Sequence, residues 1–324
     1  MKSKKNIALV AGGYSAEYEV SINSAQNIYA AIDDAIYNKY LVIITKDKWE
    51  VHYNNEIYPV DKNDFSFSPT KEKVKFDFAY VTIHGTPGEN GCLQGYFDML
   101  DIPHSTCDVL AAALTFDKYT CNHYIKDFGI NIGNSILLRT RNQHSIEEIN
   151  SLVGIPCFVK PNSDGSSFGI SKVKTIDELD TALDKAFSFS KEVIVEKAIN
   201  GLEFTCGAVK TETEDIILPV TEILSDNEFF DFGAKYDGES TEITPARISE
   251  ELTKELQRQT SLLYDVLKLK GIIRVDFIIE DSKIYVLEVN TTPGMTATSF
   301  IPQQIEADGR TLQSVISLII ENYS

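Results

Sequence analysis

The sequence has no excess of positive charge, and this narrows the range of partners. Its 324 residues include 30 Lys and Arg against 48 Asp and Glu, which gives a formal net charge of −18. A chain without an overall positive field is not expected to bind nucleic acid or an anionic membrane surface. Basic residues that gather at one place despite this balance are more typical of a site for a small anion.

The sequence also lacks paired cysteines and long apolar runs. A disulfide framework or a zinc site is not expected, because the cysteines are odd in number and never form a C-x-x-C pair. No segment approaches the ~20 apolar residues of a membrane span, and the run 7–11 is too short for the core of a signal peptide. We therefore expect a soluble cytoplasmic protein. The five cysteines are Cys92, Cys107, Cys121, Cys157 and Cys206.

Glycine and proline are modest in number, at 18 and 10 residues, and the chain has neither an internal repeat nor a low-complexity segment. With 43% hydrophobic and 24% charged residues, the composition is that of an ordinary globular protein. The length is enough for two or three domains.

The first predicted unit is a strand, a glycine turn and a helix. Residues 6–11 form an apolar run that Gly12 and Gly13 break, and a helical pattern follows. Further strands are expected at 40–45 and 78–83. This order is typical of a parallel α/β unit, although the G-x-G-x-x-G spacing of a dinucleotide site is missing.

Two polar residues come just after predicted strands of this unit. Glu17 follows the first strand, and His84 opens the loop 84–91 after the third. Each has an ordinary interpretation, as a carboxylate favoured by a helix dipole and as a structural loop histidine. Because ligands bind at the carboxyl edge of open α/β sheets, we expect both side chains to face one crevice.

A Ser- and Gly-rich loop, 161–169, lies between predicted strands 155–160 and 170–173. Such a loop can fold over a triphosphate, because it offers N–H and hydroxyl donors with little steric hindrance. An ordinary hairpin loop is the alternative. Lys160, at the end of the preceding strand, favours phosphate binding.

The next predicted strand, 192–199, has features of a nucleotide site. A strand edge offers backbone groups that can bind an adenine edge, and a carboxylate just beyond can accept ribose hydroxyls. A long loop is expected at 229–247, and loops of this length in compact domains are usually functional or mobile. Suitably placed residues are Glu196, Lys197, Ile199 and Glu203 on the strand side, and Lys235 and Tyr236 in the loop.

The most informative stretch is a predicted hairpin of strands 272–279 and 284–289. Because side chains alternate faces along a strand, Arg274 and Asp276 share one face of the first strand, and Glu288 and Asn290 share one face of the second. A three-residue loop at 281–283 would set Asp276 directly opposite Glu288.

Two carboxylates that face each other across a ladder repel each other. The pair is reasonable if a divalent cation lies between them, and Mg²⁺ prefers such oxygen ligands beside a nucleotide. A solvated polar face is the alternative. We favour the metal site, because the carboxylates interrupt strongly apolar strands and the turn 291–294 exposes N–H groups to an anion.

Eight motifs occur in order between residues 8 and 302, and together they resemble the D-alanine–D-alanine ligase family of the ATP-grasp superfamily. One such motif is weak evidence, but eight in order are highly specific. They are S-A-E-x-E-V-S (15–21), H-G-x-x-G-E-N-G (84–91), D-K (117–118), F-V-K-P-x-x-x-G-S-S-x-G (158–169), E-K (196–197), A-K-Y (234–236), R-V-D (274–276) and L-E-V-N-T-T-P-G-M-T (287–296).

The resemblance implies a fold and an activity. The fold is α/β (α+β overall), a three-domain ATP-grasp architecture with an N-terminal Rossmann-like parallel-sheet domain at 1–106 and two ATP-grasp domains at 107–200 and 201–324. The activity is ATP-dependent joining of two D-alanines through a D-alanyl phosphate, with release of ADP and phosphate. The product serves peptidoglycan synthesis and hence the cell wall and cell shape. A cytoplasmic homodimer is expected.

The resemblance also implies roles for individual residues. ATP is bound by Lys118, Lys160, Ser166, Ser167, Glu196, Lys197, Ile199, Glu203 and Lys235. Two Mg²⁺ ions, with Mn²⁺ as a possible substitute, are held by Asp276, Glu288 and Asn290. D-Alanine is bound by Glu17, His84, Arg274, Gly294, Ser299 and Phe300. The catalytic group comprises Glu17, Ser166, Arg274 and Tyr236.

The sequence departs from the family pattern at two positions. Asn90 replaces the usual Asp, and Phe300 stands where Leu is common, which affects the size of the second D-alanine pocket. Two alternatives remain. A ligase of D-alanine to D-lactate is disfavoured by Tyr236, which resembles the dipeptide-forming enzymes. A non-catalytic ATP-grasp module would require a missing lysine or metal ligand, and none is missing.

Overall fold

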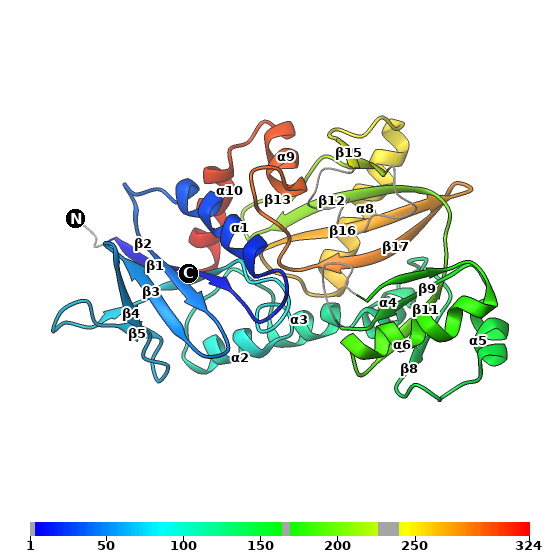
Figure 1. Cartoon of the computed structure of the whole chain (residues 1–324). Helices are drawn as coiled ribbons and strands as arrows, with labels where there is room; N and C mark the ends of the chain where they lie inside the picture. The colour runs from blue at the N-terminus through cyan, green and yellow to red at the C-terminus, as the bar shows by residue number, and fades with distance from the viewer. Residues whose placement is uncertain (1–3, 164–168, 226–239) are drawn as a thin grey trace.

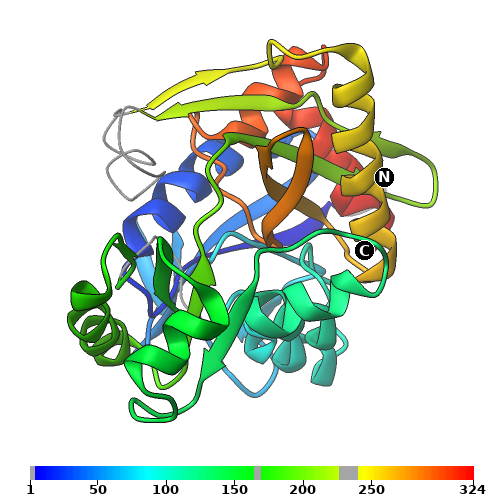
Figure 2. The ribbon, with the colours of Figure 1, turned by 90° about the vertical axis from the view of Figure 1, so that its right-hand side faces the viewer.

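A computed structural model describes residues 4–163, 169–225 and 240–324 (Figure 1). Within these ranges the chain forms sheets of five, four and six strands and a two-stranded ribbon. The four-stranded sheet lies below the six-stranded one in two perpendicular views (Figures 1 and 2). No helix in the described ranges is both long and apolar enough to cross a membrane.

The first sheet is mixed, with the strand order β4-β3-β2-β1-β7. β1 pairs in parallel with β2 and β7, as the sequence predicts. The last six residues of β1 are buried, which explains their continuous apolar run, since parallel strands are covered on both faces. The antiparallel strands β3 and β4 were not predicted. The strands are β1 (Lys5–Gly12), β2 (Tyr37–Ile44), β3 (Trp49–Tyr53), β4 (Glu56–Pro59) and β7 (Phe78–Val81), beside the ribbon of β5 (Ser66–Phe67) and β6 (Val74–Lys75).

Helices follow the strands of this sheet and lead to the second one. α4 begins at Lys118, because the side chain of Asp117 accepts a hydrogen bond from the Thr120 N–H at 2.8 Å and caps the helix. This cap sets Lys118 in the first turn. The helices here are α1 (Tyr18–Ala31), α2 (Cys92–Met99), α3 (Val109–Phe116) and α4 (Lys118–Lys126).

The second sheet is antiparallel, in the order β10-β9-β11-β8. Apolar residues of α5 and α6 pack on it in one core that includes Ile149, Leu183 and Val195. Its elements are β8 (Ser135–Leu138), α5 (Ile146–Val153), β9 (Cys157–Pro161), β10 (Ser171–Val173), the short helix η1 (Ile176–Glu178), α6 (Leu179–Phe189) and β11 (Val193–Lys197).

The third sheet has the order β15-β14-β12-β16-β17, with β13 also paired to β12. Residues 240–243, expected within a long loop, instead form β15 and pair with β14. The rest of that expected loop lies mainly outside the described residues. The elements are β12 (Leu202–Lys210), β13 (Asp215–Ile217), β14 (Thr221–Ser225), β15 (Ser240–Ile243), α8 (Glu250–Val266), β16 (Ile272–Glu280), β17 (Lys283–Asn290), α9 (Phe300–Ala307) and α10 (Leu312–Tyr323).

The β16–β17 hairpin differs from the prediction in its turn but not in its central pair. The turn has two residues, Asp281 and Ser282, both with positive φ, and the predicted three-residue loop is wrong. A two-residue turn alone would place Asp276 opposite Leu287. A β-bulge at Asp276/Phe277 shifts the register by one residue, so that Asp276 faces Glu288 as predicted.

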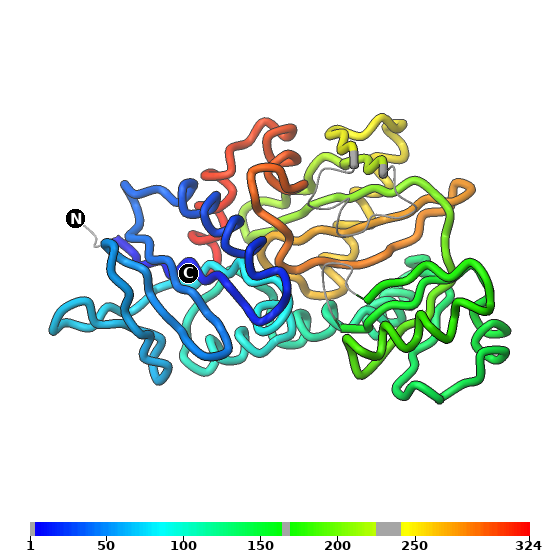
Figure 3. Tube along the Cα trace, in the orientation of Figure 1, coloured from blue at the N-terminus to red at the C-terminus, as the bar shows by residue number. Residues whose placement is uncertain are grey.

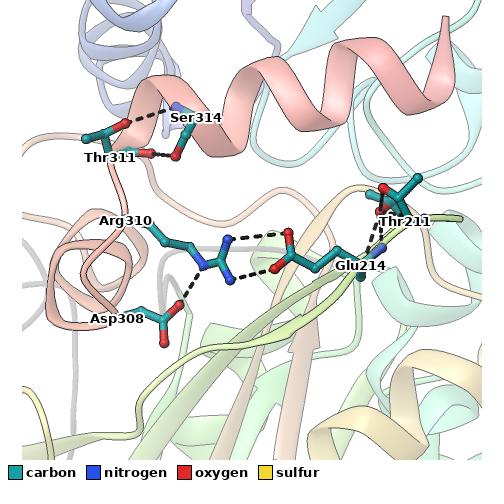
Figure 4. Close-up of polar contacts among 7 residues, drawn as sticks. Thr211, Glu214, Asp308, Arg310, Thr311 and Ser314 are labelled. Carbon is teal, nitrogen blue, oxygen red and sulfur yellow. Dashed lines mark hydrogen bonds and ion pairs between the residues drawn. The ribbon is translucent and has the colours of Figure 1, made fainter.

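The C-terminal helix returns to the beginning of the chain (Figure 3). Ile28 and Ile32 of α1 share a core with Ile316 and Ile319 of α10. The segment before α10 is anchored by Arg310, whose Nη2 donates to Glu214 Oε1 at 2.7 Å beside the β12–β13 turn (Figure 4). The last helix therefore joins the third sheet to the first unit.

Gly271, just before β16, is expected to be intolerant of a side chain. Its φ is +74°, and a Cβ atom would lie 1.9 Å from the Ser105 carbonyl oxygen. We expect Gly271→Ala to destabilise the protein by roughly 3 kcal/mol or more, since steric overlap adds to the left-handed backbone cost. The measurement is the thermal unfolding temperature.

Gly129→Ala is the matched control for this substitution. Gly129 has a similar φ of +79°, but no atom outside its chain neighbours lies within 4 Å of the place that a Cβ would take. The control should cost only about 1 kcal/mol, the backbone contribution alone. Equal losses in the two variants would show that the contact with Ser105 does not limit this position.

Candidate active site

One cavity of about 1020 Å³ brings together the described residues that the motifs single out. Its walls come from the first unit, the four-stranded sheet and the six-stranded sheet. Ser166, Ser167, Lys235 and Tyr236 lie outside the described residues. The predicted site residues that line the cavity are Glu17, His84, Lys118, Lys160, Glu196, Lys197, Ile199, Glu203, Arg274, Asp276, Glu288, Asn290, Gly294, Ser299 and Phe300.

The Asp276 carboxylate is held by four hydrogen bonds. Arg274 donates from Nε and Nη2, each at 2.8 Å, to the two carboxylate oxygens. Asn290 Nδ2 donates at 3.0 Å and Thr205 Oγ1 at 2.7 Å. Charge-assisted bidentate bonds of this kind fix both groups in one geometry. Asp276 and Arg274 are thus oriented as a unit on the floor of the cavity.

Glu288, which faces Asp276 across the two strands, has its charge offset by Lys118 of α4. Lys118 Nζ lies 3.3 Å from Glu288 Oε2. Burial alone would lower the pKa of Lys118, but the Glu288 carboxylate, with help from Glu89 and Glu17, raises it above its ordinary value. Lys118 therefore stays charged, and each of the two facing carboxylates has a cationic neighbour.

Lys118 is positioned by contacts between α4 and the end of β9. The Lys118 N–H donates to the Asn162 carbonyl at 3.2 Å, and the Tyr119 N–H donates to Asn162 Oδ1 at 3.0 Å. Asn162 Nδ2 donates in turn to Asp117 Oδ2 at 2.8 Å. This buried asparagine couples the two lysine-bearing elements, since Lys160 lies two residues before it.

Lys160 points into the cavity and not into open solvent. Its Nζ contacts Glu196 Oε2 at 2.6 Å, and the two side chains are only 14% and 7% exposed. They lie on the neighbouring antiparallel strands β9 and β11. A buried charge needs such a partner, because leaving water is costly for an isolated ion. The contact places the Lys160 ammonium, the predicted phosphate-binding group, beside the edge of β11, where the adenine is predicted to bind.

Glu17 and His84 do face one crevice, as expected from the strand ends. Both are nearly fully buried, at 7% and 6% exposure, and Ser15 Oγ donates to the His84 carbonyl at 2.9 Å. Burial lowers the pKa of His84, against the opposing effect of Glu17 and together with the charge of Arg274. The imidazole is therefore neutral near pH 7.

Sequence reasoning assigned no role to three acidic residues that line the cavity, Glu19, Glu89 and Glu242. Glu89 Oε2 accepts the Gly85 N–H at 2.6 Å. Burial, together with the Glu17 carboxylate, raises the pKa of Glu89 to about 8. Its place in the loop after β7 was a usable signal for Glu89. Glu242 had none, because its neighbours in the cavity come from distant elements.

The start of α9 forms another part of the wall. Ser299 is the N-cap, and its Oγ accepts the Thr296 N–H at 3.1 Å. The Arg274 guanidinium lies over the Phe300 ring, 5.4 Å from its centroid. The segment before α9 is tied to α1, since Asn27 Nδ2 donates to the Met295 carbonyl at 2.8 Å.

The residues around Asp276 fit a hard divalent cation. The donor set is two carboxylates and one amide oxygen, which leaves coordination positions for water and phosphate oxygens. Within the described ranges no group of three or more His, Cys, Asp or Glu is arranged to hold a metal. Because two carboxylates and one amide leave coordination positions open, the set suits a cation that also has phosphate and water ligands.

Two family models and a full-length relative match this chain, and all three are described as D-alanine–D-alanine ligases. The family model described as "D-ala D-ala ligase N-terminus" matches residues 6–107, and "D-ala D-ala ligase C-terminus" matches residues 124–321. The D-alanine--D-alanine ligase of Bacteroides fragilis is 56% identical over 321 residues, with 98% of this chain and 99% of the relative covered.

Two solved structures share the fold. D-alanyl-alanine synthetase A from Vibrio cholerae superimposes with a TM-score of 0.90 at 27% identity, covering 100% of this chain and 99% of that one. The VanG D-Ala:D-Ser ligase from Enterococcus faecalis has a TM-score of 0.89 at 32% identity, covering 99% and 100%.

The raised pKa of Glu89 predicts a pH-dependent stability effect. In the unfolded chain the carboxyl ionises near 4.5, but in the folded protein it holds its proton up to about pH 8. Ionisation therefore opposes folding increasingly between these values. A shift of one pKa unit corresponds to ~1.4 kcal/mol, and partial solvation reduces this value. The free energy of unfolding of Glu89→Gln, relative to that of the parent, should therefore rise by roughly 1–3 kcal/mol from about pH 5 to pH 8.

The measurement is the unfolding temperature of the variant and its parent at both pH values. Glu251→Gln is the control, because Glu251 is an exposed carboxylate in the first turn of α8. Its difference from the parent should stay constant over this range. A Glu89→Gln difference that is equally constant would contradict the raised pKa.

Proposed function

The chain belongs to the D-alanine–D-alanine ligase family, and we propose the following roles for its residues in the joining of two D-alanines. The reaction consumes ATP, passes through a D-alanyl phosphate and releases ADP and phosphate, and its product is a peptidoglycan precursor. The observation that carries the assignment of residues is the facing pair Asp276 and Glu288, with Arg274 and Lys118 beside them, in a cavity shared by three sheets.

In the first step the carboxylate of one D-alanine attacks the γ-phosphate of ATP. The carboxylate is a poor acyl donor to an amine, and phosphorylation gives it a leaving group. Glu17 holds the ammonium group of this D-alanine, with the neutral His84 beside it, so that the carboxylate faces the nucleotide. Phosphoryl transfer needs mainly positioning and charge neutralisation.

The nucleotide lies along the four-stranded sheet. Lys118 and Lys160 bind its phosphates, as their places on α4 and β9 allow. The edge of β11 reads the adenine, and the carboxylate of Glu203 accepts the ribose hydroxyls. The adenine contacts come from Glu196, Lys197 and Ile199, and the remaining predicted ATP residues, Ser166, Ser167 and Lys235, lie outside the described ranges.

Asp276, Glu288 and Asn290 would hold two Mg²⁺ ions, or Mn²⁺ in their place. When bound, the ions neutralise phosphate charge and orient the transferring group. Arg274 and Lys118 already offset the two carboxylates in this structure. The Asn290 amide, whose nitrogen donates to Asp276, would supply its oxygen to a bound cation.

In the second step the amine of another D-alanine attacks the acyl phosphate. Arg274 and the backbone N–H of Gly294 stabilise the oxyanion of the tetrahedral intermediate. Ser299 and Phe300 line the pocket for this second molecule. Because an acyl phosphate hydrolyses readily, water must be excluded. Ser166 and Tyr236 keep their predicted catalytic roles, and both lie outside the described residues.

Other second substrates define the alternatives. The 32% identical VanG protein is named a D-Ala:D-Ser ligase, so the family includes a member with a different second substrate. A D-lactate-using ligase is disfavoured by Tyr236. Competition among D-alanine, D-serine and D-lactate as acceptors separates these cases. A non-catalytic module is disfavoured, because the described lysines and carboxylates share one cavity.

We also propose how the chain is divided into domains and how it assembles. The domains run over residues 1–106, 107–200 and 201–324, and the three main sheets fall one within each range. The protein acts as a homodimer in the cytoplasm, on small molecules only. Sedimentation of the purified protein tests the dimer, and a monomer at working concentration would remove that part of the proposal.

Incubation with ATP, Mg²⁺ and D-alanine should yield D-alanyl-D-alanine, ADP and phosphate. Mass spectrometry of the products and D-alanine-dependent phosphate release are the measurements. ATP hydrolysis that ignores D-alanine would contradict the proposed function. Omission of Mg²⁺ should stop the reaction while leaving the unfolding temperature without nucleotide unchanged.

Glu288→Gln should lower kcat by about 1,000-fold or more, because an uncharged amide would bind a divalent cation more weakly, and that cation would neutralise the charge of the transferring phosphate. The fold should remain intact, since Gln has nearly the same size and shape. Asp281→Asn is the matched control, a carboxylate-to-amide change in the turn of the same hairpin, where Asn readily adopts positive φ. A near-normal rate for Glu288→Gln would exclude its role at the metal.

A further inference from the structure

Glu242 is an acidic residue of the cavity that the proposed steps leave without a task. It lies on β15, beside α9 (Figure 1), and it is partly buried. Its Oε2 accepts a hydrogen bond from Gln303 Nε2 at 2.7 Å, and the same Nε2 donates to the Thr298 carbonyl at 2.8 Å. A glutamine of α9 therefore orients this carboxylate at the cavity wall.

The surroundings of Glu242 are those of the expected second-substrate pocket. Gln303 is on the helix that Ser299 caps and Phe300 begins. From β16, Arg274 is the charged group close enough to act on Glu242, while on β14 its register partner is the apolar Ile223. Burial raises the pKa of Glu242, and the Gln303 hydrogen bond and the Arg274 charge oppose that shift.

Four of the other acids that line the cavity have cationic partners or proposed roles. Asp276 contacts Arg274, and Glu288 contacts Lys118. Glu196 contacts Lys160, and Glu17 is assigned to the first D-alanine. None of these belongs to α9 or to the strand beside it. Glu242 alone among these five carries a carboxylate to the side of the cavity where the second amino acid is expected.

An amino acid is a zwitterion, so its pocket needs a positive region for the carboxylate and a negative group for the ammonium. Arg274 and the N-terminus of α9 supply the positive region. We propose that Glu242 binds the ammonium group of the second D-alanine and accepts its proton before the amine attacks. This assignment rests on the proposed function and adds the residue that recognises the acceptor.

The step balances in atoms and charge. The ammonium gives one proton to the Glu242 carboxylate and becomes a neutral amine with a free electron pair. That pair forms the C–N bond to the carbonyl carbon of the D-alanyl phosphate. The C–O bond to phosphate then breaks, and the second proton of the nitrogen leaves with the phosphate as hydrogen phosphate. Glu242 finally releases its proton to solvent.

A consequence is discrimination between acceptors. D-Lactate has a hydroxyl where D-alanine has an ammonium, and it makes no ion pair with Glu242. Loss of the negative charge should therefore penalise the amino acid more than the hydroxy acid. A site built for a charged partner rejects an analogue that lacks it, since the buried group is left unpaired.

Hydroxylamine separates the two half-reactions. It traps the D-alanyl phosphate as D-alanyl hydroxamate, and as a small neutral nucleophile it needs no ammonium site. In Glu242→Gln, hydroxamate formation should stay within about twofold of the parent, while kcat/KM for the second D-alanine should fall about 10- to 100-fold, the effect of losing a bond between charged groups. The ratio of D-lactate to D-alanine use should rise.

Two further variants keep the test decisive. Gln303→Leu, which removes the group that orients Glu242, should lower dipeptide formation more than hydroxamate formation. Glu222→Gln is the matched control, because Glu222 is on β14, next to β15, and pairs with Arg247 at 3.0 Å outside the cavity lining. It should leave both rates within about twofold.

Each outcome has a distinct meaning. If both rates fall together in Glu242→Gln and Gln303→Leu while their unfolding temperatures are unchanged, or if neither rate falls, the acceptor role of Glu242 is overturned. If Glu242→Gln does not fold, the rates of Gln303→Leu decide. If the parent forms no D-alanine-dependent hydroxamate, the proposed function fails instead.

Discussion

The site depends on one electrostatic constraint, two carboxylates that face each other across adjacent strands. Asp276 and Glu288 would repel each other, and the protein offsets them with cations from different places, Arg274 on the same strand and Lys118 on α4. Lys118 belongs to α4, which lies outside the six-stranded sheet. The charge of Glu288 is therefore offset only when α4 packs against the β16–β17 hairpin. The same contacts that stabilise the pair therefore also assemble the cavity.

The cap of α4 and the buried Asn162 fix the position of Lys118 relative to the end of β9. Asp117 starts the helix at Lys118, and Asn162 binds the helix start to the end of β9. Lys160 lies on the same strand and contacts Glu196. Two lysines that are far apart in sequence thus lie on elements held by one network, and both side chains line the same cavity.

Local patterns predicted much of this arrangement, and long-range contacts account for what they missed. Alternation placed Asp276 with Arg274, and strand ends placed Glu17 near His84. The β-bulge beside Asp276 depends on how the two whole strands pair, so local patterns could not predict it. This bulge shifts the register by one residue, and Asp276 therefore faces Glu288 although the predicted turn length was wrong. Glu242 could not be found locally, because its neighbour Gln303 is 61 residues away. The strands β3 and β4 are short and partly exposed, so their apolar pattern is weak.

The contact between α1 and α10 has a consequence for the order of events during synthesis. The helix that follows Glu17 buries Ile28 and Ile32 against the last helix of the chain. The first sheet leaves the ribosome early, yet the apolar face of α1 is covered only after residues 312–323 have emerged. Domains generally fold as units as they appear, but the first unit here keeps the apolar face of α1 uncovered until residues 312–323 have been synthesised.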